Sequence, residues 1–185
     1  MRSAARYRDP SDRSTGHINK DLALAKTAIV QMLMDFVYEK PIQQWEKRLS
    51  HLVERHNSLT GQTCTSILFR GDVYFSQAHA GRNFPLFKPL HSSLYPEMVK
   101  LVQEKEALMA EKESVRTFFV IVVNATPHPQ HYRDLLPECM HAALPSIPLG
   151  KEPLPLPAET IEQIHRQCAD AILTIKRRLA MNLIL

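Results

Sequence analysis

The stretch LYPEMVKLVQEKEALMAEKESVRTFFVIVV, residues 94–123, decides the fold because one apolar periodicity runs through its whole length. The nearly seven-residue repeat consists of Leu94, Met98, Leu101, Leu108, Val115, Phe119 and Val122, with glutamates and lysines between them. This pattern predicts an amphipathic helix of roughly 25 to 30 residues, about 40 Å long. FFVIVV favours a strand when taken alone. No breaker interrupts the repeat, however, so helix is the prediction there too.

Two further helices and a β-hairpin are expected before this stretch. Apolar residues at three- and four-residue spacings between Asp21 and Val37 indicate a helix, and Pro41 stops it or starts the next one. A second stripe indicates a helix from Ile42 to Gly61; it consists of Trp45, Leu49, Leu52, Val53 and Leu59. Residues 63–77 are rich in β-branched and aromatic types, which predicts a hairpin that turns at Arg70, Gly71 and Asp72.

Proline and glycine indicate where the loops and helix caps lie in the sequence. Residues 80–91 are expected to form a loop, because Gly81, Pro85 and Pro89 punctuate them. Thr126 followed by Pro127 has the pattern of a helix N-cap with proline in the first turn. The short helix that follows is kinked or restarted at Pro137 and Glu138, and Leu144 with Pro145 closes it.

The C-terminal part is expected to be a connector and one more helix. Four prolines between 148 and 157 exclude a helix or a central strand, so residues 146–157 are predicted to be extended. A final helix starts near Glu159 and buries one stripe, which consists of Ile161, Ile164, Cys168, Ile172, Ile175 and Leu179. The apolar end MNLIL either packs on the core or contacts another subunit.

Together these elements predict a mainly helical α+β fold, with several amphipathic helices and one small β-hairpin. We expect a single domain, since 185 residues suffice to bury one core. Its parts would be a basic polar arm at 1–20, a helical body with the hairpin at 21–145, the proline-rich connector at 146–157, and a C-terminal helix at 158–185 that packs on the same domain.

Composition excludes several classes of protein. The chain is 44% hydrophobic and 23% charged, as in globular proteins rather than disordered ones. The longest apolar run is about six residues, whereas about twenty are needed to cross a bilayer, and no secretory signal is visible. The cysteines Cys64, Cys139 and Cys168 are odd in number and far apart, which favours a reducing, cytoplasmic compartment over a disulfide scaffold.

Positive charge gathers at the two ends of the chain. The formal net charge is +4, but the signs are mixed along most of the sequence. The candidate contacts to a nucleic acid or a protein partner are Arg2, Arg6, Arg8, Arg13 and Lys20 in the arm, and Lys176, Arg177 and Arg178 in the last helix. The alternative for the arm is a polar tail without a partner; the alternative for the last helix is that its cations favour the helix dipole.

The stretch NATPHPQHYRDLLPECMHAALP, residues 124–145, holds the candidate metal ligands His128, His131, Cys139 and His141. Their spacing differs from that of zinc sites. Cys139 and His141 would also lie about 200° apart on a helix. A cysteine–histidine nucleophile is a second alternative. The favoured interpretation is a short helix with its histidines on exposed turns, and no metal or other cofactor is expected.

The order of these features resembles the phage-borne nucleotide-modification-associated domain, family five. The resemblance covers about Asp21 to Pro145. It is based on the order of two helices, a hairpin and a long charged helix. After that helix the matching residues are Thr126, Leu135 with Leu136, Pro137 with Glu138, and Leu144 with Pro145. Leu136 stands where that family usually has an aromatic residue. The resemblance implies a phage or prophage origin and a link to modified DNA, and it supplies no catalytic residue.

We therefore expect a non-catalytic, phage-type accessory protein that binds a protein partner or nucleic acid, with a link to DNA modification or host takeover. It would act in the cytoplasm of a phage-infected or prophage-carrying bacterium. Self-association is the alternative to a separate protein partner, and no contact with a membrane is expected. One alternative is a structural component of a virion or another large assembly. Another is an enzyme that modifies nucleotides or DNA through the histidines and cysteine of 128–141.

Overall fold

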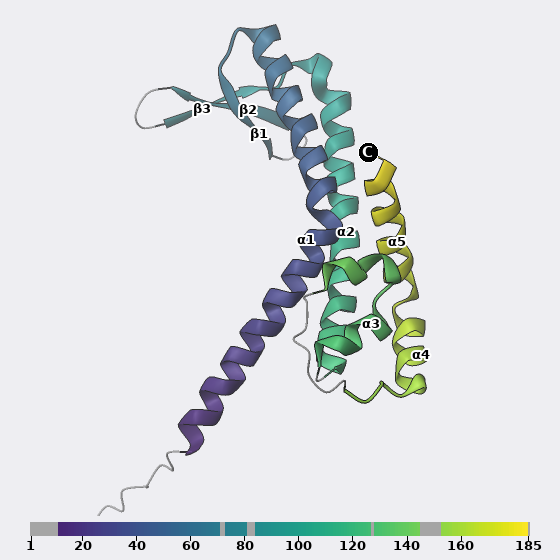
Figure 1. Ribbon diagram of the computed structural model, residues 1–185. Helices are drawn as coiled ribbons and strands as arrows, with labels where there is room; N and C mark the ends of the chain where they lie inside the picture. Colours follow the sequence, from purple (N-terminus) through teal and green to yellow (C-terminus); the bar gives the residue numbers. More distant parts are fainter. Residues whose placement is uncertain (1–10, 71–72, 81–83, 127, 145–152, 185) are drawn as a thin grey trace, which may run out of the picture. The chain divides into compact units, whose positions relative to one another are not determined.

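The computed structural model describes residues 11–70, 73–80, 84–126, 128–144 and 153–184, and their side chains except those of 11–18, 78–80 and 84–86. The fold is mainly helical α+β with a three-stranded antiparallel sheet, which confirms the predicted class (Figure 1). The elements are α1 (Ser11–Thr60), β1 (Cys64–Arg70), β2 (Val73–Ala80), β3 (Phe84–Pro89), η1 (Ser92–Leu94), α2 (Tyr95–Ala125), η2 (Pro129–His131), α3 (Tyr132–Leu135), η3 (Glu138–Ala143), α4 (Ala158–Gln167) and α5 (Ala169–Ile184).

The chain forms two compact units. We call Met1–Val37 together with Ser114–Leu185 the helical unit, and Tyr38–Glu113 the sheet unit. The division falls within α1 and α2, so each of these helices contributes one part to each unit.

Helix α1 corrects two of the sequence predictions. It begins at Ser11, ten residues before the expected start at Asp21, because no proline between them stops a helix. It also continues through Pro41 instead of ending there. Pro41 cannot donate to the carbonyl of Val37, which costs about 3 kcal/mol. Burial of Val37 and Tyr38 before the proline and of Leu52 after it offsets that cost.

Helix α2 confirms the long helix predicted from the apolar repeat. It spans 31 residues and includes FFVIVV. Phe118, Phe119, Val122 and Val123 are all at most 1% exposed. Their burial outweighs the strand preference of that sequence, since packing overrides the weak intrinsic propensities.

The core of the sheet unit gathers residues from α1, the sheet and α2. Its buried residues are Leu52, Tyr74, Leu90, Leu94, Met98 and Leu101. Trp45 packs against this cluster, and its Nε1 donates to the carbonyl of Leu101 over 2.8 Å. Gly61 has φ of +68° and follows the last residue of α1, as predicted, because glycine adopts this left-handed conformation without strain.

The sheet contains the predicted hairpin and one strand more. Strands β1 and β2 pair antiparallel up to Arg70 and Val73, while Gly71 and Asp72 lie outside the described residues. Strand β3 pairs with β2 where a loop was expected. Leu90 N donates to Tyr74 O. Hydrogen-bonded positions alternate along an antiparallel strand, so the backbone nitrogens of Pro85 and Pro89 are at positions that do not donate to β2. Prolines are tolerated there because β3 is an edge strand.

The C-terminal region contains two helices where one was predicted. The backbone of Cys168 departs from helical geometry, with φ of −115° and ψ of 21°, and this separates α4 from α5. The bonds Cys168 N to Ile164 O and Ile172 N to Cys168 O remain, so the predicted stripe continues across the break. Ile164, Cys168, Ile175 and Leu179 are buried. Most of the predicted connector, 145–152, lies outside the described residues, and 153–157 has no regular structure.

None of the helices in the described ranges combines the length and the apolar character needed to cross a bilayer.

The core of the sheet unit predicts a local stability effect. Leu52→Ala removes a fully buried side chain and should lower the free energy of unfolding by about 2–5 kcal/mol. Trp45 is the single tryptophan of the chain and packs on the same core, so its fluorescence in a urea titration reports this unit. The matched control is Leu59→Ala, because Leu59 is 54% exposed on the same helix. Equal destabilisation by both substitutions would contradict the assignment of Leu52 to the core of the sheet unit.

Candidate protein-interaction surfaces

The histidines of 128–141 bind backbone groups. His128 caps η2, where its Nδ1 accepts from Gln130 N over 3.2 Å. His131 is buried, and its Nε2 lies 2.6 Å from the carbonyl oxygen of Leu154. A carbonyl only accepts, so this Nε2 carries the proton and donates. His131 Nδ1 is buried without a hydrogen-bond partner among the described residues.

His141 and His165 have the same role, because each forms hydrogen bonds from one ring nitrogen to backbone carbonyl oxygens. His141 Nε2 lies 3.1 Å from Arg133 O and 3.2 Å from Leu136 O. His165, which the sequence did not single out, places its Nε2 3.1 Å from Leu135 O and so ties α4 to α3. The predicted exposed turns are therefore wrong for His131, which is buried, and for His128 and His141, which are half-buried.

The predicted cap at Thr126 is also corrected. Thr126 is buried and its hydroxyl donates to Val122 O over 3.1 Å, at the end of α2. Thr126 therefore finishes one helix, and His128 begins the next turn. Burial raises the pKa of Tyr132, and a hydrogen bond with Thr126 partly counters that effect. Pro127 and Pro145 lie outside the described residues.

The four candidate metal ligands do not form one cluster. The rings of His128 and His131 are 6.3 Å apart, centre to centre, and Cys139 is exposed. In the part of the chain that the structure describes, no three His, Cys, Asp or Glu side chains are placed to share a metal ion. The arrangement that is seen is a set of imidazoles that bond backbone groups in η2, in and just after α3, and at Leu154.

A shallow groove lies beside this region, within the helical unit. Its volume is about 370 Å³, and it is lined by Leu136, Pro137, His165, Ile172, Leu173 and Lys176. Its surface is mainly apolar, and Lys176 is exposed on it. A groove of this kind suits a small apolar group next to an anion.

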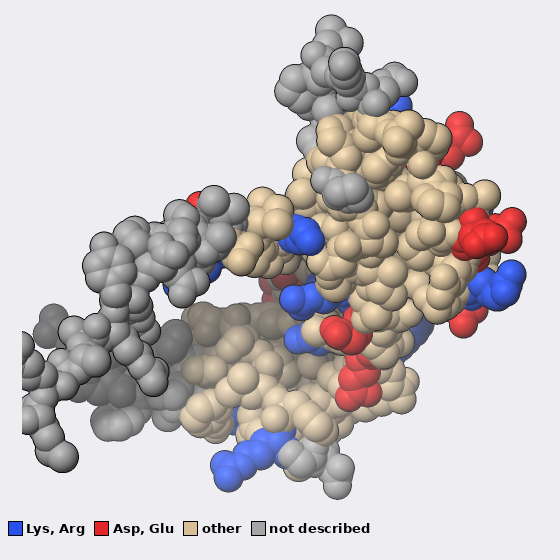
Figure 2. All heavy atoms as spheres, turned by 90° about the horizontal axis from the view of Figure 1, so that it is seen from below, with Lys and Arg blue, Asp and Glu red and all other residues tan. Residues whose placement is uncertain are grey.

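The predicted cationic contacts are only partly described. Arg2, Arg6 and Arg8 lie outside the described residues, and Arg13 lies near the start of α1. Lys20, Lys176 and Arg177 are exposed, whereas Arg178 is half-buried. Figure 2 shows one face of the molecule, on which lysines and arginines are interspersed with acidic side chains. On that face the described residues form no single basic patch.

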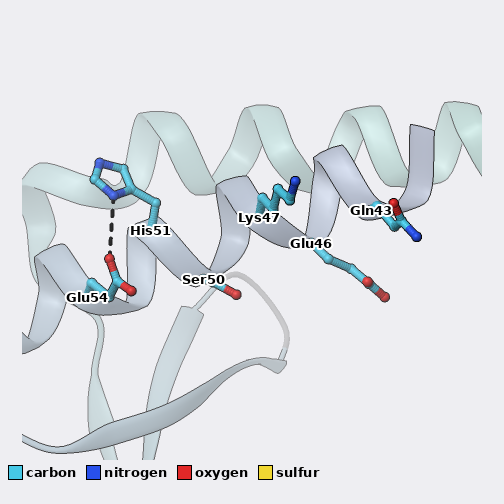
Figure 3. A pocket seen from close by; sticks show the side chains of 6 residues that line it. All are labelled: Gln43, Glu46, Lys47, Ser50, His51 and Glu54. Atoms are coloured by element: carbon cyan, nitrogen blue, oxygen red, sulfur yellow. Dashed lines mark ion pairs between the residues drawn. The ribbon is translucent and has the colours of Figure 1, made fainter. Parts of the chain in front are cut away.

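The sheet unit also has a polar hollow, formed by one side of α1 alone (Figure 3). Its volume is about 460 Å³, and its residues recur at helical spacing: Gln43, Glu46, Lys47, Ser50, His51 and Glu54. One helix lines it, so it has no opposite wall that would enclose a substrate. We interpret it as a solvated helix face.

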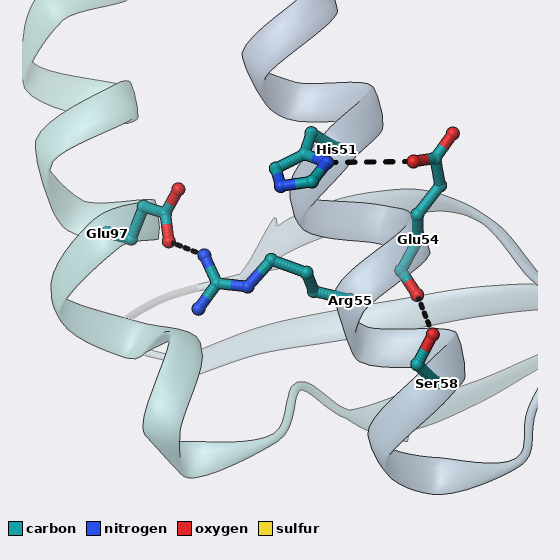
Figure 4. A network of polar contacts seen from close by, with 5 residues as sticks. All are labelled: His51, Glu54, Arg55, Ser58 and Glu97. Carbon is teal, nitrogen blue, oxygen red and sulfur yellow. Dashed lines mark hydrogen bonds and ion pairs between the residues drawn. The ribbon is translucent and has the colours of Figure 1, made fainter.

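Ion pairs join α1 and α2 within the sheet unit. Arg55 pairs with Glu97, while His51 Nδ1 lies 3.6 Å from Glu54 and the hydroxyl of Ser58 donates to the backbone carbonyl of Glu54 (Figure 4). Arg48 pairs with Glu104, and this hydrogen bond lowers the pKa of the Glu104 carboxyl. These pairs are exposed, so each contributes only about 0–1 kcal/mol.

A buried polar network lies under the sheet, and sequence reasoning missed it. His56 is fully buried; its Nδ1 accepts from His91 N over 3.2 Å, and its Nε2 lies 3.4 Å from Gln62 Oε1. The same Gln62 oxygen accepts from Ser76 over 3.3 Å. The spacing of the helix could have indicated that His56 is buried, because His56 continues the apolar stripe of Trp45, Leu49 and Leu52.

The opposite face of the sheet exposes apolar side chains, next to the polar residues Ser66, Arg70 and Gln77. Tyr74 and Ser76 of β2 are buried, and so the alternation of the strands puts Val73 and Phe75 on the other side. The pairing places the neighbours there as well, and we define this outer face by Leu68, Val73, Phe75, Phe87 and Pro89. Leu68 is 41% exposed, Val73 39% and Phe87 53%. An antiparallel sheet usually turns polar residues to water on such a face.

Comparison of the chain with protein-family models, with curated proteins and with solved structures gives no match.

The burial of the cysteines predicts their reactivity. Cys139 is exposed, Cys64 and Cys168 are buried, and burial raises the pKa of the Cys168 thiol. Because the thiolate is the reactive form, one thiol should react with a thiol reagent at pH 8 on the order of 100-fold faster than the other two. Cys139→Ser should remove the fast reaction, and Cys168→Ser should leave it. Two fast thiols in the folded wild type would refute this.

Proposed function

We propose that the chain is a non-catalytic accessory protein that binds a protein partner through the outer face of its sheet. The observation that carries the proposal is the exposure of Leu68, Val73 and Phe87 on one face of β1–β3. Apolar side chains held together in water are unfavourable by roughly 25 cal/mol for each Å² exposed. Contiguous patches of this kind on a folded surface are typical of protein-binding sites.

The composition of the outer face favours a protein over a nucleic acid. Phe75 and Phe87 are diagonal neighbours across β2 and β3, and Leu68 faces Phe75 from β1. Aromatic residues are enriched in protein–protein contacts, whereas nucleic acids are bound mainly through cations that neutralise phosphates. Arg70 is exposed at the end of β1 and lies on the same side as Val73. The complementary partner surface is therefore apolar, with an acidic side chain at its rim.

The resemblance noted in the sequence supplies the biological setting of this proposal. A phage-type accessory protein linked to DNA modification or host takeover would act by binding another protein of that system. The setting stays a prediction, and the binding surface is supported independently of it by the residues of the sheet.

Site-specific photo-crosslinking in the cells that carry the gene tests this function. A photoreactive phenylalanine analogue at Phe87 should yield one discrete crosslinked protein, because Phe87 lies within the outer face. The matched control carries the analogue at Met109, which is 56% exposed in the same unit but lies on α2. Leu68→Asp should lower the Phe87 product at least about tenfold, because a buried charge costs more than 1.4 kcal/mol, and Met109→Asp should leave it unchanged.

Three results would contradict the proposal. Equal products from positions 87 and 109 would show that the outer face has no preference. A product that nuclease digests would assign the face to nucleic acid, and a product made of two copies of this chain would assign it to self-association.

A further inference from the structure

Helix α1 carries a second apolar stripe that the described residues of its own unit leave partly exposed. Leu22, Ala25, Ile29, Met32 and Phe36 follow one another at spacings of three, four, three and four residues. Leu22 is 53% exposed, Met32 36% and Phe36 40%, while Ala25 is exposed and Ile29 half-buried. We call this set the α1 stripe. Its spacing is the heptad pattern with Leu22, Ile29 and Phe36 at a and Ala25 and Met32 at d.

The α1 stripe is distinct from the face that α1 buries in the helical unit. The buried residues there are Val30, Leu33, Met34 and Val37. At 100° per residue the two sets lie roughly 110° apart round the helix. A helix that is apolar on two sides is suited to two neighbours, and the described part of the helical unit supplies one of them.

The turns of α1 from Asn19 to Ala28 also have little packing. From Asn19 to Ala28 every residue is exposed except Lys26, which is half-buried and donates to Asn124 Oδ1 over 3.2 Å. Isolated helices shorter than about 12–15 residues are marginal in water, and protein helices are stabilised chiefly by packing of an apolar face. A second helix on the α1 stripe would provide that packing.

We propose that the α1 stripe binds the same stripe of a second copy of this chain, as a parallel two-stranded coiled coil. The flanking charges favour this occupant. In the heptad, Asp21 and Asp35 are at g, and Lys26 is at e. A parallel pair sets g against the e residue about five positions further along its partner, so Asp21 of each copy faces Lys26 of the other.

An antiparallel pair in the register that sets Ile29 beside Ala25 would have the opposite electrostatics. When Ile29 of one copy packs beside Ala25 of the other, Asp21 faces Asp35, and Lys26 faces the Lys26 of its partner. Like charges at these flanking positions are unfavourable, whereas the parallel arrangement pairs opposite charges on both sides. Charge therefore favours an identical helix in the parallel direction over this antiparallel register.

Sedimentation equilibrium of the full chain tests the proposal. The wild type should show a concentration-dependent monomer–dimer equilibrium. Leu22→Gln with Met32→Gln keeps good helix formers but removes apolar contacts from both copies, so the dimer dissociation constant should rise at least about 100-fold. The matched control is Leu24→Gln, because Leu24 is 69% exposed on the same helix but lies off the stripe. The control should dimerise like the wild type.

A charge exchange tests the direction. Asp21→Lys alone and Lys26→Asp alone should each weaken the dimer, and the two together should restore it, because a parallel pair again sets opposite charges face to face. In the antiparallel pair described above, Asp21→Lys alone would instead strengthen the dimer, because it sets a lysine against Asp35. A chain that stays monomeric at every concentration, or a dimer that the stripe variants leave unchanged, would overturn the proposal, and so would a double exchange that fails to restore it.

This inference does not depend on the function proposed for the sheet. Leu68→Asp should leave the dimer intact, and the stripe variants should leave crosslinking from Phe87 to a different protein in place.

Discussion

The structure depends on one constraint, which is that a helix buries only as much of its circumference as its neighbours cover. Helix α1 is 50 residues long and α2 is 31, and each contributes to two separate units. In the sheet unit Leu52 and Leu101 share one core. In the helical unit the buried side of α1 is narrow, and apolar residues such as Leu22 and Phe36 are left exposed. Cores determine the fold, and the apolar surface that remains determines which contacts the protein can make.

Sequence reasoning succeeded where one periodicity ran without a competitor. The repeat from Leu94 to Val122 predicted α2, including the part with strand preference, because burial of Phe118 and Phe119 outweighs local propensity. The fold class followed from the same patterns. Periodicity also contained the α1 stripe, but it indicated only a helix and did not separate the apolar residues that are buried from those that stay exposed. Only side-chain exposure separates a stripe that is buried from one that is not.

Two of the wrong predictions share a physical cause, since proline was taken as a stop signal regardless of its surroundings. Pro41 lies inside α1 because buried residues on both sides of it hold the helix. Pro85 and Pro89 lie in β3 because an edge strand has positions where a missing N–H costs nothing. Neither circumstance is local in sequence. The buried state of His131 was equally hidden, since it depends on the carbonyl of Leu154, twenty-three residues away.

The two proposed surfaces belong to different units, and this has a consequence for binding strength. A dimer formed through the α1 stripe would carry two outer faces, one on each chain. Against a partner that is itself repeated, the second contact becomes intramolecular once the first has formed. Binding can then strengthen by about 10²–10⁴-fold without any new contact, provided that the spacing of the partner's sites fits. The outer face exposes three large apolar side chains, Leu68, Val73 and Phe87, so each single contact would be weak. Weak contacts used in pairs suit a protein that joins large assemblies, and on this point the accessory and the assembly interpretations of the sequence converge.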